Sequence, residues 1–160
     1  MKGLIIEGAD GTGKTTLAKI IAAKFGWDIC HCTAEDPADF DFYKQTVRKK
    51  NVIWDRHTIG ELIYPYVFDR KAKIGTEEAR IVLNTAKQNN IGVIVLTANL
   101  DDIKSRLIER GNECKEVLNN LEWINDQFKF YANAYHLSVI DTSRGINYDE
   151  LFRWLEKDFT

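Results

Sequence analysis

The sequence predicts an α/β fold, in which a five-stranded parallel sheet is flanked by helices on both faces. Short apolar runs suited to buried strands alternate along the chain with segments whose apolar residues recur at helical spacing. No repeat, low-complexity segment or linker interrupts this alternation, so we expect residues 1–160 to form a single domain. An apolar fraction of 44% is sufficient for a well-packed core.

The first strand is expected at residues 4–6, a continuous apolar run that stops at Gly8. The second contains Cys30, His31 and Cys32, whose side chains should alternate between its two faces. This alternation favours two buried thiols over a metal site. The second to fifth strands are expected at residues 27–33, 51–55, 91–96 and 137–141.

Helices are expected between these strands. Gly26 should end the first, Asp36 should cap the second ahead of Pro37, and Pro65 should kink or break the third. Thr76 should cap a fourth, and a long helix should carry the apolar residues from Val117 to Tyr131. In full, we expect helices over residues 15–25, 36–47, 58–68, from 76, 101–110, 117–131 and 148–157.

The overall composition excludes several classes of protein. A net charge of −2, without a basic excess, makes a nucleic-acid partner unexpected. No apolar run is long enough to span a membrane. Three cysteines form no paired framework, so a cytoplasmic location is expected. A small-molecule substrate therefore fits best, and a homodimer remains open.

The segment from Gly8 to Thr15 matches the pattern G-x-x-x-x-G-K-T, which cradles nucleoside triphosphates. It follows an apolar strand and opens a helix, as the pattern requires. Glycines let backbone N–H groups approach phosphate oxygens, Lys14 can bridge the outer phosphates, and Thr15 can bind Mg²⁺. ATP and Mg²⁺ are therefore the expected cofactors. The expected loop contacts are Gly8, Asp10, Gly11, Thr12, Gly13, Lys14, Thr15 and Thr16.

A kinase also needs cations for the migrating phosphoryl group and a lid that excludes water. Arg56 follows the third strand, where Asp55 beside it can hold Mg²⁺ or anchor the arginine. Arg106 and Arg110 lie one helical turn apart before Gly111, so residues of about 106–116 are expected to form a lid. Lys14, Arg56, Arg106 and Arg110 are thus the expected catalytic residues.

These motifs resemble the thymidylate kinase family of P-loop nucleotide kinases. The likeness rests on the loop around Asp10, the pair Asp55-Arg56, and the lid entry at residues 106–111. It implies the P-loop nucleoside kinase fold, with Asp10 on the deoxyribose 3′-hydroxyl and Arg56 on the acceptor phosphate. It also implies that the loop after the last strand lines adenine, which places Thr142, Ser143 and Arg144 at the donor. The short chain resembles bacteriophage members, which would place it in the host cytoplasm.

The sequence departs from that family after the second strand, where the family's Arg-Glu-Pro-Gly is replaced by residues 33–37. Asp55-Arg56-His57 is also similar to herpesvirus-type thymidine kinases, which use a carboxylate base that Glu35 or Asp36 could supply. The acceptor-binding region, about 33–75, is expected to use Asp10, Glu35, Asp36, Phe40, Arg56, Glu61 and Tyr64.

The favoured function is ATP- and Mg²⁺-dependent phosphorylation of a deoxynucleoside monophosphate such as dTMP. Three alternatives stay open: a deoxynucleoside kinase, a kinase acting on a modified base or a nucleic-acid end, and a regulatory module that only binds ATP.

Overall fold

The computed structural model describes residues 1–33, 35–36, 38–111 and 114–157. Five parallel strands form one sheet in the order β2-β3-β1-β4-β5, which confirms the predicted fold class. The strands are β1 (Gly3–Gly8), β2 (Asp28–His31), β3 (Val52–Asp55), β4 (Ile91–Thr97) and β5 (Ser138–Asp141). The helices are α1 (Lys14–Phe25), α2 (Phe40–Thr46), α3 (Thr58–Val67), α4 (Thr76–Gln88), α5 (Leu100–Glu109), α6 (Lys115–Asn119), α7 (Leu121–Ala134) and α8 (Tyr148–Glu156), with a 3₁₀ turn, η1 (Thr142–Arg144).

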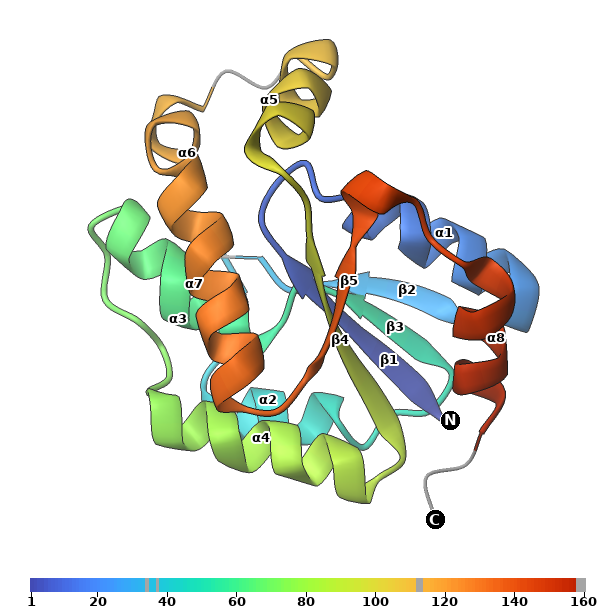
Figure 1. Ribbon diagram of the computed structural model, residues 1–160. Coiled ribbons are helices and arrows are strands. Elements are labelled where there is room, and N and C mark those ends of the chain that lie inside the picture. Colours follow the sequence, from blue (N-terminus) through green and yellow to red (C-terminus); the bar gives the residue numbers. More distant parts are fainter. Residues whose placement is uncertain (34, 37, 112–113, 158–160) are drawn as a thin grey trace.

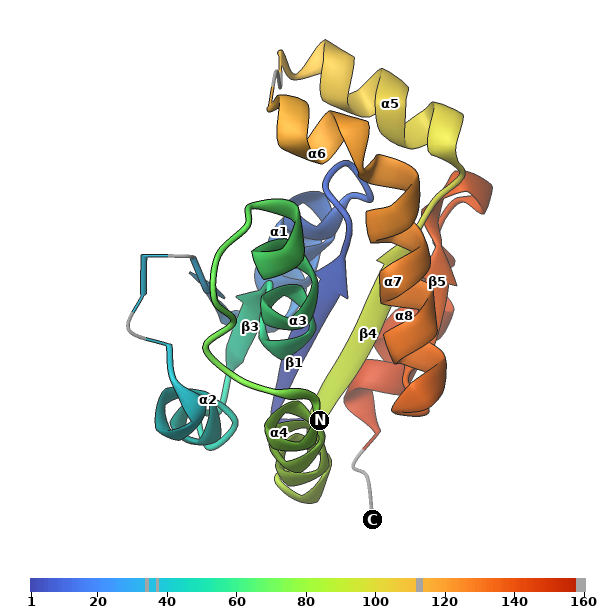
Figure 2. The ribbon, with the colours of Figure 1, turned by 90° about the vertical axis from the view of Figure 1, so that its left-hand side faces the viewer.

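Helices cover both faces of the sheet (Figures 1 and 2). Side chains of β1 alternate between the faces. Leu4 and Ile6 pack with α1 and α8, whereas Ile5 packs on the opposite face with α2 and α4. The helices α3 and α7 complete that second face around Phe128. β1 is the middle strand and all six of its residues are buried, so the phosphate loop that follows it begins at the centre of the sheet.

The helices α5 and α6 lie beyond the carboxyl ends of the strands, above the phosphate loop (Figure 1). The chain start lies at the opposite edge, where the Met1 amino group donates to the carbonyls of Leu155 and Lys157, each at 2.9 Å. Among the described residues, no helix has the length and apolar character needed to cross a membrane.

Two predicted helix starts were wrong. The helix expected from Asp36 begins at Phe40, because Asp39 caps it by accepting from the Phe42 N–H at 2.9 Å. The Asp36 carboxylate instead accepts from the Thr33 N–H at 2.6 Å, and Pro37 lies outside the described residues. The cap of α4 is Gly75 rather than Thr76.

Two helices differ from the prediction in their continuity. The helix α3 continues through Pro65 without a break, since Pro65 is buried and the helix ends only two residues later. The long helix expected around residues 117–131 is divided into α6 and α7 at Asn120, whose side-chain amide donates to the Glu116 carbonyl at 2.8 Å. The second strand is shorter than expected: it ends at His31, leaving Cys32 buried beyond it and Cys30 half-buried within it.

Candidate functional site

The phosphate-binding loop requires glycine at two positions. Gly8 has φ +142°, and a Cβ there would collide with the Leu96 carbonyl. Gly13 has φ +96°, and no atom lies within 4 Å of the position its Cβ would occupy. Its backbone is therefore open to approach by a phosphate, at the start of α1, where the helix dipole favours an anion.

Lys14 is the cation of this loop. Its side-chain amine donates to the carbonyls of Gly8 and Ala9, both at 2.8 Å. Burial and then the charge of Arg56 lower the pKa of Lys14 to about 8. A bound phosphate would supply the negative charge that this ammonium lacks.

Thr15, in the first turn of α1, meets Asp55 at the end of β3. The Thr15 hydroxyl donates to Asp55 Oδ2 at 2.6 Å, and His31 Nδ1 lies 3.4 Å from the same oxygen. The other oxygen, Asp55 Oδ1, is buried with no hydrogen-bond partner among the described residues. An unsatisfied buried carboxylate oxygen beside a hydroxyl is the donor set that Mg²⁺ prefers, so these residues fit the expected metal.

Asp10, Arg56 and Tyr64 form a cluster that joins the phosphate loop to α3. The Arg56 guanidinium donates to Asp10 Oδ1, and the Tyr64 hydroxyl donates to Asp10 Oδ2 at 2.8 Å. The guanidinium carbon also lies 5.4 Å from the centre of the Tyr64 ring. Burial alone would raise the pKa of Asp10, but Arg56 and Lys14 outweigh it and lower that pKa. Asp10 is therefore a carboxylate held in a fixed position.

The backbone of Arg56 is strained, with φ +74°. This left-handed conformation is uncommon outside glycine and asparagine, and it is found often at functional sites. The backbone N–H of Arg56 donates to the Ile6 carbonyl at 3.0 Å, which fixes the turn at the end of β3. The fold thus holds the backbone of Arg56 in an unfavourable conformation beside the loop.

A pocket of about 540 Å³ opens beside this cluster. Its size falls within the range of about 300–1,000 Å³ that is usual for small-molecule sites. Thr15 and Asp55 lie at one part of its wall, and Tyr43 and Phe68 supply aromatic surface. The full lining is Thr15, His31, Cys32, Thr33, Tyr43, Asp55, Arg56, His57, Gly60, Glu61, Tyr64, Phe68 and Arg70.

Glu61 and Arg70 form an ion pair in the pocket wall. The two nitrogens of Arg70 donate to the two oxygens of Glu61 at 2.8 and 2.9 Å, and the Lys73 N–H donates to Glu61 at 2.8 Å. The Lys73 side chain reaches the Asp36 carbonyl at 2.5 Å, which ties the segment after α3 to the loop after β2. Glu61, a predicted substrate contact, is thus present in the wall but already paired.

Arg106 joins the helix α5, the predicted lid entry, to the phosphate loop. Its guanidinium donates to the Gly11 carbonyl at 3.1 Å and to the Thr142 hydroxyl at 2.9 Å. A Cβ at Gly11 would lie 3.1 Å from Ile103 Cγ2 and 3.2 Å from Leu107 Cγ, so α5 packs directly on the loop. Arg110, predicted to face inward as well, is exposed at the end of α5. Residues 112–113 of the predicted lid lie outside the described residues.

The structure separates several other predicted residues from the pocket. Glu35 is exposed, and Phe40 packs beside α4 with Lys44 above its ring at 4.4 Å. Neither they nor Asp36 line the pocket, because α2 begins later than predicted. Near the donor loop, Thr142 donates to the Thr12 carbonyl at 2.9 Å, and the Ser143 hydroxyl accepts from the Asn99 N–H at 2.7 Å. The Arg144 side chain and Thr16 are exposed.

Sequence reasoning missed Glu7. This glutamate is fully buried at the end of β1, and one carboxyl oxygen accepts from the Ile59 N–H at 2.7 Å, at the start of α3. Burial raises the pKa of Glu7 to about 7. An acidic residue on the inward face of an apolar strand, next to the loop, was the available signal.

His57, which follows Asp55-Arg56 at the strand end, lines the pocket. The Thr46 hydroxyl donates to the Tyr43 carbonyl at 2.7 Å, so it accepts from His57 Nε2–H at 2.7 Å. Burial lowers the pKa of His57 to about 3. The imidazole is therefore a neutral part of the wall.

The comparisons with known proteins agree with this geometry. The sequence profile of the ATPase family associated with various cellular activities (AAA) matches residues 4–142. The chain belongs to this family. The AAA match runs from β1 through the phosphate loop to Thr142, and therefore contains every residue of the clusters described above. No curated protein sequence matches the chain.

Among solved structures, similar folds come from nucleotide-binding proteins. The YorR protein of Bacillus subtilis, in complex with phosphorylated GDP, shares 21% identity over 95% of each chain, with a TM-score of 0.79. Deoxyadenosine kinase from M. mycoides with bound dATP shares 19% identity over 98% of this chain and 100% of that chain, with a TM-score of 0.60. Thymidylate kinase from Candida albicans shares 17% identity over 96% and 88%, with a TM-score of 0.61. Within the AAA family, the chain thus has a fold that kinases of nucleosides and nucleotides share.

Proposed function

We propose that this protein transfers the terminal phosphoryl group of ATP to a deoxynucleoside monophosphate, such as dTMP or a related pyrimidine nucleotide. An acceptor phosphate oxygen forms a bond to the terminal phosphorus of ATP, the bond from that phosphorus to the bridging oxygen breaks, and ADP leaves. The observation that carries the proposal is the Asp10–Arg56–Tyr64 cluster, which stands between the phosphate loop and a pocket of about 540 Å³.

The donor side of the proposal rests on the phosphate loop. The open backbone at Gly13 and the Lys14 ammonium provide contacts for the outer phosphates. Arg106 would add positive charge from the lid, which we propose to span residues of about 106–116. Because α5 packs on Gly11, a movement of this helix would change the position of the phosphate loop.

Mg²⁺ fits the same end of the site. Thr15 and Asp55 would hold it, since one Asp55 oxygen is buried without a partner. The ion would supply neutralising charge to the phosphate oxygens.

The acceptor side favours a monophosphate over a nucleoside. A monophosphate is already an anionic nucleophile and needs cations rather than a general base. Glu61 in the pocket wall is paired with Arg70, and Asp10, behind the pocket lining, is paired with Arg56. Glu35 and Asp36, the expected bases of the alternative, lie outside the pocket lining. Asp10 keeps the role of contacting the sugar hydroxyl.

A deoxynucleoside kinase is the second candidate. It is supported by the similarity in fold to deoxyadenosine kinase and by the presence of Glu61 in the pocket wall. In that case Glu61 would have to leave Arg70 to accept the hydroxyl proton. The family description itself supports a third candidate, hydrolysis of ATP without an acceptor.

Coupled assays with ATP, Mg²⁺ and a panel of deoxynucleosides and their monophosphates would separate these candidates. We expect ADP formation that depends on a monophosphate and a diphosphate product detected by mass spectrometry. Modified nucleotides and oligonucleotide ends belong in the panel as further acceptors. If ATP binds but no member of the panel is phosphorylated, the kinase proposal is wrong; acceptor-independent phosphate release would indicate an ATPase, and binding without turnover a regulatory module.

A further inference from the structure

A second pocket, of about 520 Å³, lies at the amino ends of β4 and β5, at the edge of the sheet opposite the phosphate loop. Its size is similar to that of the pocket beside Arg56 and suits a small molecule. The pocket is bounded by α4, the end of α7, the first residues of β4 and β5, and α8. No residue of the phosphate loop or of the acceptor pocket contributes to it.

Cationic side chains line this pocket, and none of its described lining residues is acidic. The cations are Arg80 and Lys87, both from α4, and His136 follows α7. Arg80 donates to Glu77 through two nitrogens, and because this pair is exposed to water, a bound phosphate would compete with Glu77 for the guanidinium. Lys87 forms no ion pair within the described chain. The ends of α4 and α7 add only partial negative charge, about half an elementary charge each, against these cations.

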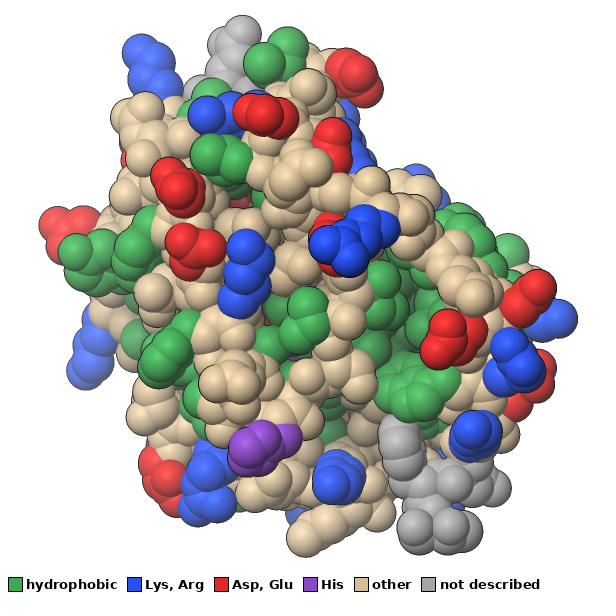
Figure 3. All heavy atoms as spheres, viewed as in Figure 1, with side chains coloured by type: hydrophobic (Ala, Val, Ile, Leu, Met, Phe, Trp, Pro, Cys, Tyr) green, Lys and Arg blue, Asp and Glu red, His purple; other side chains and the backbone are tan. Residues whose placement is uncertain are grey.

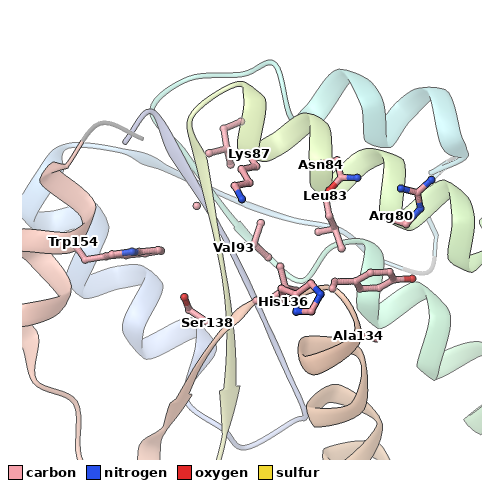
Figure 4. Close-up of a pocket in the computed structure, with 13 residues that line it drawn as sticks. Arg80, Leu83, Asn84, Lys87, Val93, Ala134, His136, Ser138 and Trp154 are labelled. Carbon is pink, nitrogen blue, oxygen red and sulfur yellow. The ribbon is translucent and has the colours of Figure 1, made fainter. Parts of the chain in front are cut away.

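The pocket also offers flat apolar surface. Trp154 of α8 lies at one side and Arg80 at the other, with Val93, His136 and Ser138 between them (Figure 4). Gly92 lacks a side chain at the floor, and the Met1 side chain fills that space: a Cβ at Gly92 would meet Met1 Sδ and would lie 3.0 Å from the Trp154 ring. On the face seen in Figure 3, the hydrophobic side chains that gather between β5 and α8 line a neighbouring pocket, which shares Ser138 and Trp154 with this one. Aromatic surface at one end and cations at the other match a planar ring that carries an anionic group.

We propose that this pocket binds a nucleoside phosphate at a site separate from the phosphate loop. The base would stack on Trp154, and the phosphate would contact Lys87 and Arg80. Asn84 and Ser138 supply polar groups between these ends. The proposal does not depend on the proposed kinase function, because none of its contacts belongs to that site.

Backbone amide NMR of the full chain, titrated with AMP, tests the proposal directly. We expect two separate sets of shifts, one at Gly11 and Gly13 and another at Gly92, Leu137 and Ser138. Lys87→Ala should weaken binding at the second set by about threefold to tenfold and leave the first set unchanged. Lys19→Ala, an exposed helical lysine elsewhere, is the matched control and should change neither set.

A steric variant and two partial ligands complete the test. Ser138→Phe should fill the pocket and abolish the second set; an aromatic residue suits this exposed strand position, so folding should be retained. Adenosine and inorganic phosphate should each bind the second set more weakly than AMP. The proposal is overturned if AMP shifts only the amides of the phosphate loop, if adenosine binds the second set as tightly as AMP, or if Ser138→Phe leaves that set unchanged.

Discussion

The side of the sheet where the strands end (the carboxyl edge) and the side where they begin (the amino edge) carry their charged groups in opposite ways. At the carboxyl edge, Glu7, Lys14 and Asp55 are buried, and the Arg56–Asp10 pair joins residues 46 positions apart. At the amino edge, the charged groups are exposed, and Arg80 pairs with Glu77 only three residues away in α4.

This difference shows where the fold accepts a cost in stability. Removing ionised groups from water is unfavourable unless partners compensate, whereas an exposed pair within one helix changes stability little. The buried charges at the carboxyl edge remain incompletely compensated, because one oxygen each of Glu7 and Asp55 has no hydrogen-bond partner in the part of the chain that the structure describes. A bound phosphate and cation would complete that edge, so substitutions there should affect catalysis strongly, and substitutions at the amino edge should affect it weakly.

The largest effect is expected for Lys14→Ala. If the Lys14 ammonium contacts the transferred group as proposed, its loss should lower kcat/KM by at least about a hundredfold, because stabilisation of transition-state charge is usually a dominant contribution. Steady-state assays of ADP formation would measure it. Lys19→Ala, on the exposed face of the same helix, should stay within about twofold of the wild type. Near-normal turnover by Lys14→Ala would contradict the proposal that the carboxyl edge carries the reaction.

Arg56→Ala should cost about 3 kcal/mol of transition-state stabilisation, if the guanidinium clamps phosphate as proposed. The comparison of kcat/KM with the wild type gives this value. Arg153→Ala, which alters an exposed arginine of α8, serves as the control. Unchanged turnover would limit Arg56 to holding Asp10.

Asp10→Asn should raise the KM of the acceptor by about tenfold while the KM of ATP stays within about twofold, since the proposed partner of Asp10 is the sugar hydroxyl. The amide can still accept from Tyr64, so the variant should fold. Equal losses for both substrates would instead mean that Asp10 shapes the loop.

Glu7→Gln should change how stability depends on pH. Burial raises the pKa of Glu7 from 4.5 to about 7, so its favourable contribution is complete below pH 4.5 and is lost as the pH rises toward 7. The free energy of unfolding of the variant, relative to the wild type, should therefore increase by on the order of 2 kcal/mol between pH 5 and pH 8. Urea unfolding at both values measures this difference. Glu122→Gln, at an exposed position of α7, should show no such trend, and a flat difference for Glu7→Gln would contradict the raised pKa.

The smallest effect is expected for Arg80→Ala, whose thermal midpoint should match that of the wild type within error because its ion pair is exposed. Arg70→Ala is the matched comparison, since it leaves the buried Glu61 carboxylate without its bidentate partner and should lower the midpoint clearly. Equal thermal midpoints for the two variants would contradict the inference that ion pairs at the two edges differ in their contribution to stability.

The sequence predicted the parts of this molecule that depend on local pattern. The five strands, the loop from Gly8 to Thr15 and the position of Arg56 at a strand end all follow from short motifs and apolar runs. The pairing of Arg56 with Asp10 and Tyr64 was not predicted, because it depends on the packing of α3 against β1. The exclusion of Phe40 from the pocket depends on a single capping choice at Asp39.

Glu7 illustrates the limit of pattern-based inference. Its position in the strand predicts which face it occupies, but its burial depends on the helices that cover that face. A sequence pattern also does not show which local group a side chain will bind. Asp36, a predicted site residue, instead accepts a hydrogen bond from the Thr33 N–H.

The central position of β1 has a consequence for local unfolding. β1 pairs with both β3 and β4 and is buried throughout, whereas β2 is a short strand at the edge of the sheet with a single partner. Segments with few partners open more often than the core, so β2 should open more readily than β1, which anchors the phosphate loop. The phosphate loop is therefore preorganised, and in the proposed reaction ATP would be held in place before the second substrate binds.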